Sequence, residues 1–577
     1  MAWLERWRSA ADHPWPLLTK ERPGVVSGVA LLAVVALSAA ASGQPPTFVY
    51  AGPSGVVFTV TDDGLSTISV GGKQVAGGGA RLLDLRQSFT SSASAFAIPA
   101  PREKRLTRRS DTEVEVEHEQ GDVRVRWRYR FADEDVTIAA RVENNHVSEA
   151  LKVAAFGLPT FSFGRSPDGQ LFTHSPGYIE PNGGLGRFYW PGYWSRLGGA
   201  WQADDAFGYG LTPLGLGLSP HLFLGGSFGA PARQQGGAWR NQPLYLVPSP
   251  VPPGGARTYA CALRVSPQRA FRHLLAPYKA YFDATFGRCR YRSDMRPVVM
   301  YSSGDAYHAS PENPFGFNGL ARRVDLPEGA KAFADMVIGG MKAARCQGFV
   351  AWALSGWDPR GAMYRTDFDV FPAAIEANLS SLRERFEEAG LRLGLATRPG
   401  EVTYRGGRTW DGTIRLSPDD PWHLEHQWRR FRRMIDAGFT LFYLDTFGHS
   451  LDDVKTARYL RERMGPNIQT YSEYHTDVSL LYSGAYKEVG YDKAAGRFHA
   501  DQATWETFRW LVPEAQAMVV SRVNDADVPG GATAVSKFLL EQHMSPTIAD
   551  YLVGSQAKAL RGLVDATVDE RGQWRVP

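Results

Sequence analysis

From Ser266 onward the chain alternates apolar runs, typical of buried strands, with amphipathic runs, typical of helices. Such alternation over roughly 250 residues is typical of a (β/α)8 barrel. A doubly wound sheet would compete, but no G-x-G-x-x-G or Walker pattern follows a strand here. The apolar runs predict strands at Pro297–Ser302, Gly348–Ala353, Arg392–Thr397, Thr440–Asp445, Ile468–Glu473 and Ala517–Ser521, with weaker ones near Gly496–Ala500 and Thr547–Leu552. Helices are predicted at Arg269–Phe286, Ala330–Arg345, Ile375–Ala389, Leu424–Ala437 and Val454–Met464.

Between Phe48 and Val265 the pattern has a different period. Short alternating or β-branched segments are separated by turn signals such as Asp62-Asp63-Gly64 and Gln120-Gly121-Asp122, and no helical run of useful length occurs. Many short strands at this spacing predict a large antiparallel β-sandwich. The clearest predicted strands are Val56–Thr61, Thr67–Val70, Thr112–Glu117, Val123–Phe131 and Val136–Val142.

The N-terminal segment has the parts of an export signal. The uncharged run Val25–Ala41 follows Arg6, Arg8, Lys20 and Arg22 and ends in small residues. The run lies near the lower limit for a bilayer span, and its basic flank also suits an uncleaved anchor. We therefore expect an exported protein that is periplasmic, secreted or attached to a membrane by this segment. The expected domains are a signal peptide or anchor at 1–44, a β-sandwich at 45–266, a helical linker at 267–295 and a catalytic barrel at 296–577.

Composition excludes several classes of function. The 64 Lys and Arg residues nearly balance 60 Asp and Glu without a long basic run, which gives no case for nucleic acid. Cys261, Cys289 and Cys346 lack the C-x-x-C spacing of a zinc site, and no H-E-x-x-H is present. We expect no metal and no cofactor. Aromatic residues make up 12% of the chain, and the faces of Trp and Tyr can stack on sugar rings.

Carboxyl side chains follow several predicted strands, at the end where a barrel holds its active site. Asp445 ends the apolar run FTLFYLD, Glu473 ends the next strand, and Asp501 follows the weak sixth strand. A carboxylate ending an apolar run is costly unless the site solvates or uses it. Two carboxyl groups over one mouth are what glycoside hydrolysis needs. The three are therefore candidate catalytic residues.

Other side chains near the strand ends are candidates for binding a sugar. The aromatic ones could form a stacking floor, although any single one is as easily a core residue. Arg398 could bind a substrate group or form a structural ion pair. The candidate substrate-binding residues are Asp305, Trp352, Trp357, Asp358, Arg398, Tyr471 and His475.

The order of a large β-sandwich, the segment YKAYFDATFG and a barrel resembles retaining α-glycoside hydrolases of the α-galactosidase and α-glucosidase type, and also the endo-α-N-acetylgalactosaminidases. The resemblance covers the architecture after residue 48 and implies a galactose-mutarotase-like supersandwich. LFYLDTFG is similar to the strand-four nucleophile segment of these families, which implies that Asp445 is the nucleophile. WALSGWDP resembles their substrate-lining loop.

The resemblance leaves the acid/base open between two residues. HADQATWETF is similar to the sixth-strand region of α-galactosidases and nominates Asp501, but the fuller W-x-G-D signature is missing. TYSEYH is similar to the segment after the nucleophile in the N-acetylgalactosaminidase type and nominates Glu473, whose strand is better defined.

The sequence therefore predicts an exported retaining glycoside hydrolase acting on an α-linked glycoside or polysaccharide, in which Asp445→Asn abolishes turnover. Two alternatives stay open. One is a non-catalytic carbohydrate-binding or envelope polysaccharide assembly protein. The other is a transglycosylase that uses the same site.

Overall fold

The structure is a computed structural model. It describes residues 45–78, 81–84, 96–97, 101–151, 155–170, 195–196, 199–214, 227–229, 233–235, 237–241, 243–246, 251–302, 327–352, 357–358, 363–364, 373–406, 409–448, 451–499, 502–521, 527–548 and 555–575. Contacts divide the chain into two compact units, Met1–Asp168 with Gln202–Leu218 and Ser227–Arg269, and Gly169–Trp201 with Ser219–Gly226 and Ala270–Pro577. The N-terminal targeting segment lies outside the described residues. None of the described helices is both long and apolar enough to cross a bilayer.

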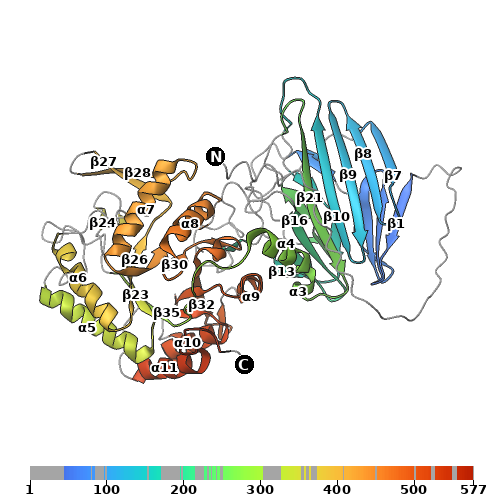
Figure 1. Cartoon of the computed structure of the whole chain (residues 1–577). Coiled ribbons are helices and arrows are strands. Elements are labelled where there is room, and N and C mark those ends of the chain that lie inside the picture. The colour runs from blue at the N-terminus through green and yellow to red at the C-terminus, as the bar shows by residue number, and fades with distance from the viewer. Residues whose placement is uncertain are drawn as a thin grey trace, which may run out of the picture. The chain divides into compact units, whose positions relative to one another are not determined.

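The first unit is an antiparallel β-sandwich, as predicted (Figure 1). One sheet has the order β1 (Thr47–Ala51), β2 (Val56–Thr61), β3 (Gly64–Val70), β4 (Lys73–Gly77), β12 (Thr160–Phe163), β19 (Ala238–Asn241), β18 (Arg233–Gln235). A second has the order β13 (Asp168–Gln170), β15 (Ala200–Ala203), β16 (Gly208–Leu214), β21 (Ala256–Ser266), β10 (Asp135–Asn144), β9 (Val123–Ala132), β8 (Glu113–Gln120), β7 (Glu103–Arg108). A smaller sheet joins β17 (Ser227–Gly229), β20 (Pro243–Leu246), β11 (Ala155–Gly157), β5 (Arg81–Asp84) and β6 (Phe96–Ala97).

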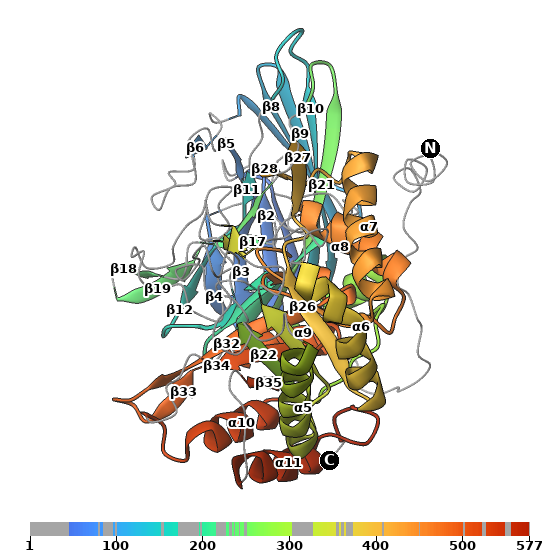
Figure 2. The ribbon, with the colours of Figure 1, turned by 90° about the vertical axis from the view of Figure 1, so that its left-hand side faces the viewer.

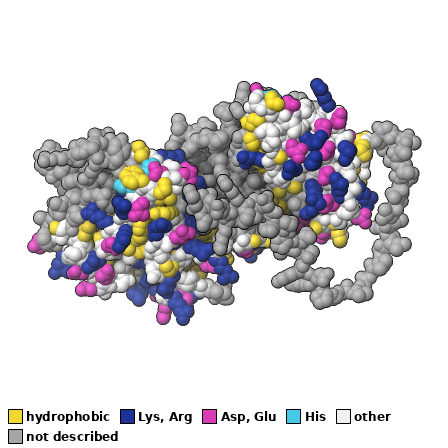
Figure 3. Space-filling model, turned by 45° about the horizontal axis from the view of Figure 1, so that its top comes forward, with side chains coloured by type: hydrophobic (Ala, Val, Ile, Leu, Met, Phe, Trp, Pro, Cys, Tyr) yellow, Lys and Arg dark blue, Asp and Glu magenta, His cyan; other side chains and the backbone are white. Residues whose placement is uncertain are grey.

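Alternation in the strands separates a core face from a charged face. In β9, Val125, Trp127 and Tyr129 are buried in the sandwich core. The arginines between them project outward and pair with glutamates of β8, and Figure 3 shows basic and acidic side chains intermixed on the visible surface. The pairs are Arg124–Glu119, Arg126–Glu117, Arg128–Glu113 and Arg130–Glu113.

The second unit is a closed barrel of parallel strands, which confirms the predicted (β/α)8 fold. Its strands are β22 (Val298–Ser302), β23 (Gly348–Trp352), β26 (Arg392–Thr397), β29 (Phe439–Leu444), β30 (Gln469–Ser472), β32 (Gly484–Asp492), β34 (Ala517–Ser521) and β35 (Ser545–Ile548). Pairing of β30 with both β29 and β32 closes the ring. Alternate side chains, Val350, Leu441 and Met518 among them, fill the interior.

Helices surround the barrel strands in both ribbon views (Figures 1 and 2). They are α5 (Pro327–Ala344), α6 (Ala373–Glu388), α7 (Pro421–Asp436), α8 (Leu451–Met464), α9 (Gln502–Leu511), α10 (Gly531–Glu541) and α11 (Ser555–Thr567), preceded by α3 (Phe271–Leu274) and α4 (Ala276–Phe286). Short additions are the hairpins β24 (Trp357–Asp358) with β25 (Met363–Tyr364) and β27 (Glu401–Gly406) with β28 (Thr409–Arg415), the pair β14 (Ser195–Arg196) with β31 (His475–Thr476), and the 3-10 turn η3 (Ser479–Leu481).

The sixth barrel strand is not where the sequence predicted it. The predicted segment near Gly496–Ala500 contains β33 (Arg497–His499), which folds back antiparallel on the end of β32. The strand in the barrel is Gly484–Asp492, whose buried Lys487 and Glu488 interrupt its apolar pattern and hide it from a search for apolar runs. The eighth strand is confirmed at Ser545–Ile548, a little before its predicted position.

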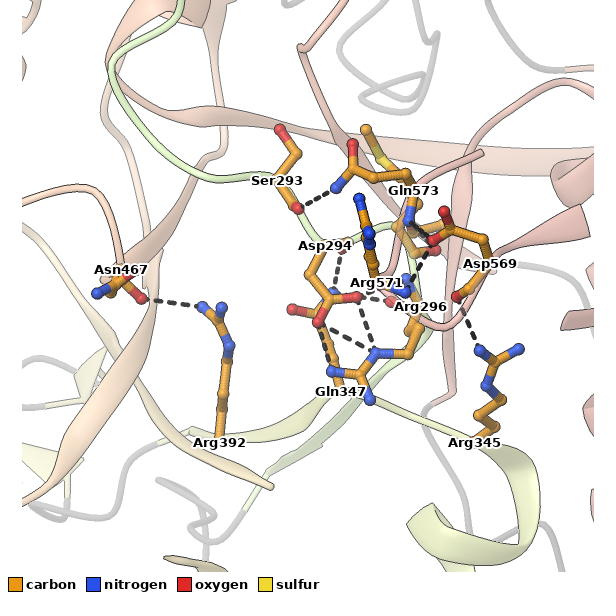
Figure 4. A network of polar contacts seen from close by, with 12 residues as sticks. Ser293, Asp294, Arg296, Arg345, Gln347, Arg392, Asn467, Asp569, Arg571 and Gln573 are labelled. Carbon is orange, nitrogen blue, oxygen red and sulfur yellow. Dashed lines mark hydrogen bonds and ion pairs between the residues drawn. The ribbon is translucent and has the colours of Figure 1, made fainter. Parts of the chain in front are cut away.

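A polar network closes the amino-terminal end of the barrel (Figure 4). Nε of Arg296 donates to Asp294 Oδ1 at 2.9 Å, and the Gln347 amide donates to the carbonyl oxygens of Asp294 at 2.6 Å and Arg296 at 2.8 Å. Gln573, near the last described residue, donates to the Ser293 carbonyl at 2.7 Å. Buried charges and carbonyls at this end therefore have partners within the network.

Candidate active site

Asp445 and Glu473 lie where strands four and five end, and both point into the barrel. Hydrogen bonding continues past the strand ends, because Asp445 N donates to the Thr397 carbonyl at 2.8 Å and Glu473 N to the Leu444 carbonyl at 3.0 Å. Tyr443 and Tyr471, two residues earlier on each strand, belong to the barrel core. Since side chains alternate along a strand, the two carboxyl groups share this inward face.

Asp445 is buried and forms an ion pair with Arg398, at the end of strand three. The side chain of Asp445 is 8% exposed, and its Oδ2 accepts from Arg398 Nε at 2.5 Å. An ionised carboxylate removed from water needs a paired, hydrogen-bonded cation. Arg398 therefore supplies the counter-charge for this carboxyl group, and of its two predicted roles the structure shows the ion pair.

The environment of Glu473 favours the protonated form of its carboxyl group. Burial, and then the nearby charge of Asp445, raise the pKa of Glu473 to about 8. A side-chain hydrogen bond to Asp445 raises it further, whereas the Thr446 N–H and the charge of Arg398 lower it. The protonated carboxyl of Glu473 thus donates to Asp445. The site pairs an acid of raised pKa with a carboxyl group that is bound by Arg398.

The turn after Asp445 fixes the acid in place. Thr446 has a φ of +51°, which a β-branched residue rarely adopts, and its N–H donates to Glu473 Oε2 at 2.7 Å. Gly448, with a φ of +109°, then passes so close to strand five that a Cβ would lie 2.0 Å from the Tyr474 carbonyl oxygen. The Thr446-Phe447-Gly448 turn therefore depends on glycine at 448.

A third carboxyl group near Asp445 was missed by the sequence analysis. Glu401 begins β27, directly after strand three, and burial raises its pKa. The charge of Arg398 lowers that pKa, and the charge of Asp445 raises it. No signal in the sequence marks Glu401, because it lies four residues beyond the end of strand three, in a segment without an apolar strand or helix pattern.

Two predicted substrate contacts lie elsewhere. Tyr471 is fully buried in the barrel core, where Gln347 donates to its hydroxyl at 3.3 Å, on the side of the amino-terminal network. His475 is also fully buried and packs against the Phe508 ring, and burial lowers its pKa. Their contact with a substrate stays a prediction.

The remaining predicted residues cannot be placed at the site. Asp501 and Asp305 lie outside the described residues. Trp352 ends β23, and Trp357 and Asp358 form β24, but their side chains are not described. Among the described residues, no group of three or more His, Cys, Asp or Glu side chains is placed to hold a metal ion.

Strand six adds a buried tyrosine–carboxylate pair that the sequence analysis missed. The Tyr486 hydroxyl donates to Glu488 Oε1 at 2.9 Å, and both side chains are buried. A signal was present: Tyr-x-Asp/Glu occurs at 443–445, 471–473 and 486–488. It was overlooked because strand six was placed too late in the chain.

Fold and site together define a β-sandwich followed by a (β/α)8 barrel, with a carboxylate and a carboxylic acid over strands four and five. No protein-family model and no curated protein matches the chain. The solved structure of the α-N-acetylgalactosaminidase NagBb from Bifidobacterium bifidum in complex with GalNAc is similar, with 13% identity, a TM-score of 0.59, and coverage of 90% of this chain and 92% of that chain. Its complex with Gal-NHAc-DNJ gives a TM-score of 0.60 at 13% identity, with the same coverage.

The galactosidase domain of the α-galactosidase-sucrose kinase AgaSK is 12% identical, with a TM-score of 0.46 over 90% of this chain and 75% of that chain. At these identities a likeness shows the fold alone. The likeness to NagBb confirms, at the level of the fold, the resemblance drawn from the sequence.

Proposed function

We propose that the protein is a retaining α-glycoside hydrolase in which Asp445 is the nucleophile and Glu473 the acid/base. The observation that carries the proposal is the Asp445–Glu473 pair, one member ion-paired with Arg398 and the other with a pKa raised to about 8. Two carboxyl groups in opposite protonation states are what glycoside hydrolysis requires. The fold shared with NagBb, itself an α-N-acetylgalactosaminidase, supports an α-glycoside as substrate.

In the first step an Asp445 oxygen attacks the anomeric carbon while the bond to the leaving oxygen breaks. Glu473 gives its proton to that oxygen, so the aglycone departs as an alcohol and a glycosyl ester remains on Asp445. In the second step Glu473, now a carboxylate, removes a proton from water. The water oxygen displaces Asp445 from the anomeric carbon, and both carboxyl groups return to their starting states.

The closeness of the pair favours retention. Retaining enzymes hold their carboxyl groups about 5–5.5 Å apart and inverting enzymes about 6.5–9.5 Å apart, to leave room for water. Here the two side chains are in hydrogen-bond contact, a separation nearer to the retaining range than to the inverting one. Asp445 stays anchored by Arg398, which keeps the nucleophile in place as the sugar enters.

The test measures two things: which anomer of the sugar is released first, and how the rate of the Glu473 variant depends on the leaving group. Aryl α-galactosides and α-N-acetylgalactosaminides should be hydrolysed, and proton NMR should show the α-anomer as the first product. Glu473→Gln should lose most of kcat/KM on an alkyl glycoside but little of kcat/KM on a dinitrophenyl glycoside, whose leaving group needs no proton. A β-anomer as the first product would mean inversion. Binding of a polysaccharide without turnover would favour the non-catalytic alternative.

Export is part of this proposal and is supported by the basic residues ahead of the apolar run Val25–Ala41. The full chain and a chain starting at residue 45 should therefore differ in location when both are expressed with the same tag. Recovery of the full chain in the cytoplasm would contradict export. Membrane recovery released only by detergent would identify an anchor.

A further inference from the structure

Three consecutive barrel strands share one pattern, a tyrosine followed two residues later by a carboxyl side chain, which lies at the end of strands four and five and within strand six. Strands four and five supply Tyr443 with Asp445 and Tyr471 with Glu473, which the proposed mechanism uses. Strand six supplies Tyr486 with Glu488, which it does not use. The Tyr486–Glu488 pair therefore has no role in the proposed mechanism.

The strand register brings the third pair to the same mouth. Leu444 is paired with Ser472, and Ser472 with Ala485, so Asp445, Glu473 and Tyr486 follow at corresponding positions of three adjacent strands. The Tyr443 and Tyr486 rings lie 5.0 Å apart within the barrel core. Tyr486 therefore stands beside the carboxyl pair, at its level.

Glu488 lies one pleat further toward the open end. Two residues of strand rise about 6.6–6.8 Å, and Glu488 shares the inward face of Tyr486. Its neighbour in the ladder, Val520 of strand seven, also belongs to the barrel core. The intervening Lys487 points the other way, with Nζ 5.8 Å from the Phe508 ring centroid. The Glu488 side chain thus faces the barrel interior, one pleat beyond Asp445 and Glu473 toward the open end.

The geometry points to Glu488 as a substrate-binding carboxylate that accepts hydrogen bonds from hydroxyl groups of the sugar held at Asp445, with Tyr486 as its positioning residue. An ionised carboxylate is an acceptor only, with about four lone-pair sites, and sugar hydroxyls are the complementary donors. The Tyr486 hydroxyl, donating to Oε1 at 2.9 Å, fixes the orientation of the group. This role rests on the proposed function, because it needs a sugar in the barrel mouth.

Glu488→Gln tests the role, since glutamine keeps the size of the side chain and an oxygen for Tyr486. On the nitrophenyl α-glycoside that the wild type hydrolyses best, kcat/KM should fall about 10- to 100-fold, the range for a hydrogen bond to a charged group. Tyr486→Phe should cost less, because the carboxylate remains. The decisive substrates are monodeoxy analogues: the one lacking the bound hydroxyl should be hydrolysed about equally by wild type and Glu488→Gln.

Asp477→Asn is a matched control. Asp477 is also a buried carboxylate that accepts from a tyrosine, Tyr278, but this partner comes from α4 and not from a barrel strand. Its kcat/KM and its response to deoxy analogues should match the wild type. If Glu488→Gln instead loses the same factor on every analogue, Glu488 is structural and the inference is overturned.

Should the wild type hydrolyse none of these glycosides, the proposed function fails while the binding role stays testable. Calorimetric titration of galactose and N-acetylgalactosamine into wild type and Glu488→Gln then decides it. Weaker binding to the variant supports the role, and equal binding or none to either protein overturns it.

Discussion

The two ends of the barrel treat buried charge in opposite ways. At the amino-terminal end, Asp294 is matched by Arg296, and side-chain amides cover neighbouring carbonyl groups. At the carboxyl-terminal end, Asp445 and Glu473 lie together with Arg398, so that one carboxyl group keeps its proton. Matched charges hold a barrel closed, whereas an excess of carboxyl groups creates an acid and a nucleophile. The difference separates the end that stabilises the fold from the end that performs chemistry.

The largest expected effect is that of Asp445→Asn. Loss of the nucleophile should lower kcat on an aryl glycoside on the order of 10^4-fold or more, while the amide still accepts from Arg398 and the fold persists. The measurement is kcat beside circular dichroism and the unfolding midpoint. Retained turnover in a folded variant would refute the nucleophile assignment.

Asp294→Asn makes the corresponding change at the other end. It leaves Arg296 without its buried counter-charge, which should lower the free energy of unfolding by about 3 kcal/mol. Activity per folded molecule should stay within about twofold, because the site lies at the opposite strand ends. Urea unfolding and active-site titration measure the two quantities. A large loss of activity without a loss of stability would show that the two ends are not independent.

Gly448→Ala should disturb the catalytic end through the backbone. The new Cβ would meet the Tyr474 carbonyl in a left-handed conformation, which should cost about 2 kcal/mol or more and displace Glu473. Gly465→Ala is the matched control: its φ is +76° but it has open space around it, so only the strain of about 1 kcal/mol remains. Equal costs for both variants would mean that the close approach at Gly448 relaxes freely.

The smallest expected effect is the change of kcat/KM and of stability with pH. The general acid must be protonated, so kcat/KM should fall about tenfold per pH unit above about pH 8, where Glu473 ionises. The pKa of Glu473 is higher in the folded than in the unfolded chain, so its contribution to stability is full below pH 4.5 and is lost as pH rises through 8. Glu473→Gln should remove both trends. A fall of kcat/KM that begins near pH 5 in the wild type would contradict the raised pKa.

Periodicity was enough to predict the sandwich, the barrel and most strand positions, because apolar side chains alternate where one face is buried. It failed at strand six, where Lys487 and Glu488 are buried charges. Asp445 was found because it follows a clear apolar run, and Glu473 because it ends the next predicted strand. Lying near a strand end does not say which side chains are exposed, and both Tyr471 and His475 are fully buried. The proximity of Glu401 to Arg398 and Asp445 depends on the fold, which no spacing along the chain encodes.

The amino-terminal network brings the first and the last residues of the barrel segment together. Gln573 bonds to Ser293 at 2.7 Å, and Met295 N donates to the Gly572 carbonyl at 2.8 Å, so the barrel starts and finishes at one spot. A short linker could join these places, and new termini could open in an exposed turn without crossing the site. The order of the barrel strands around the ring would stay the same, while the chain would begin at a different strand. Circular permutation thus becomes a practical route to study it apart from the sandwich.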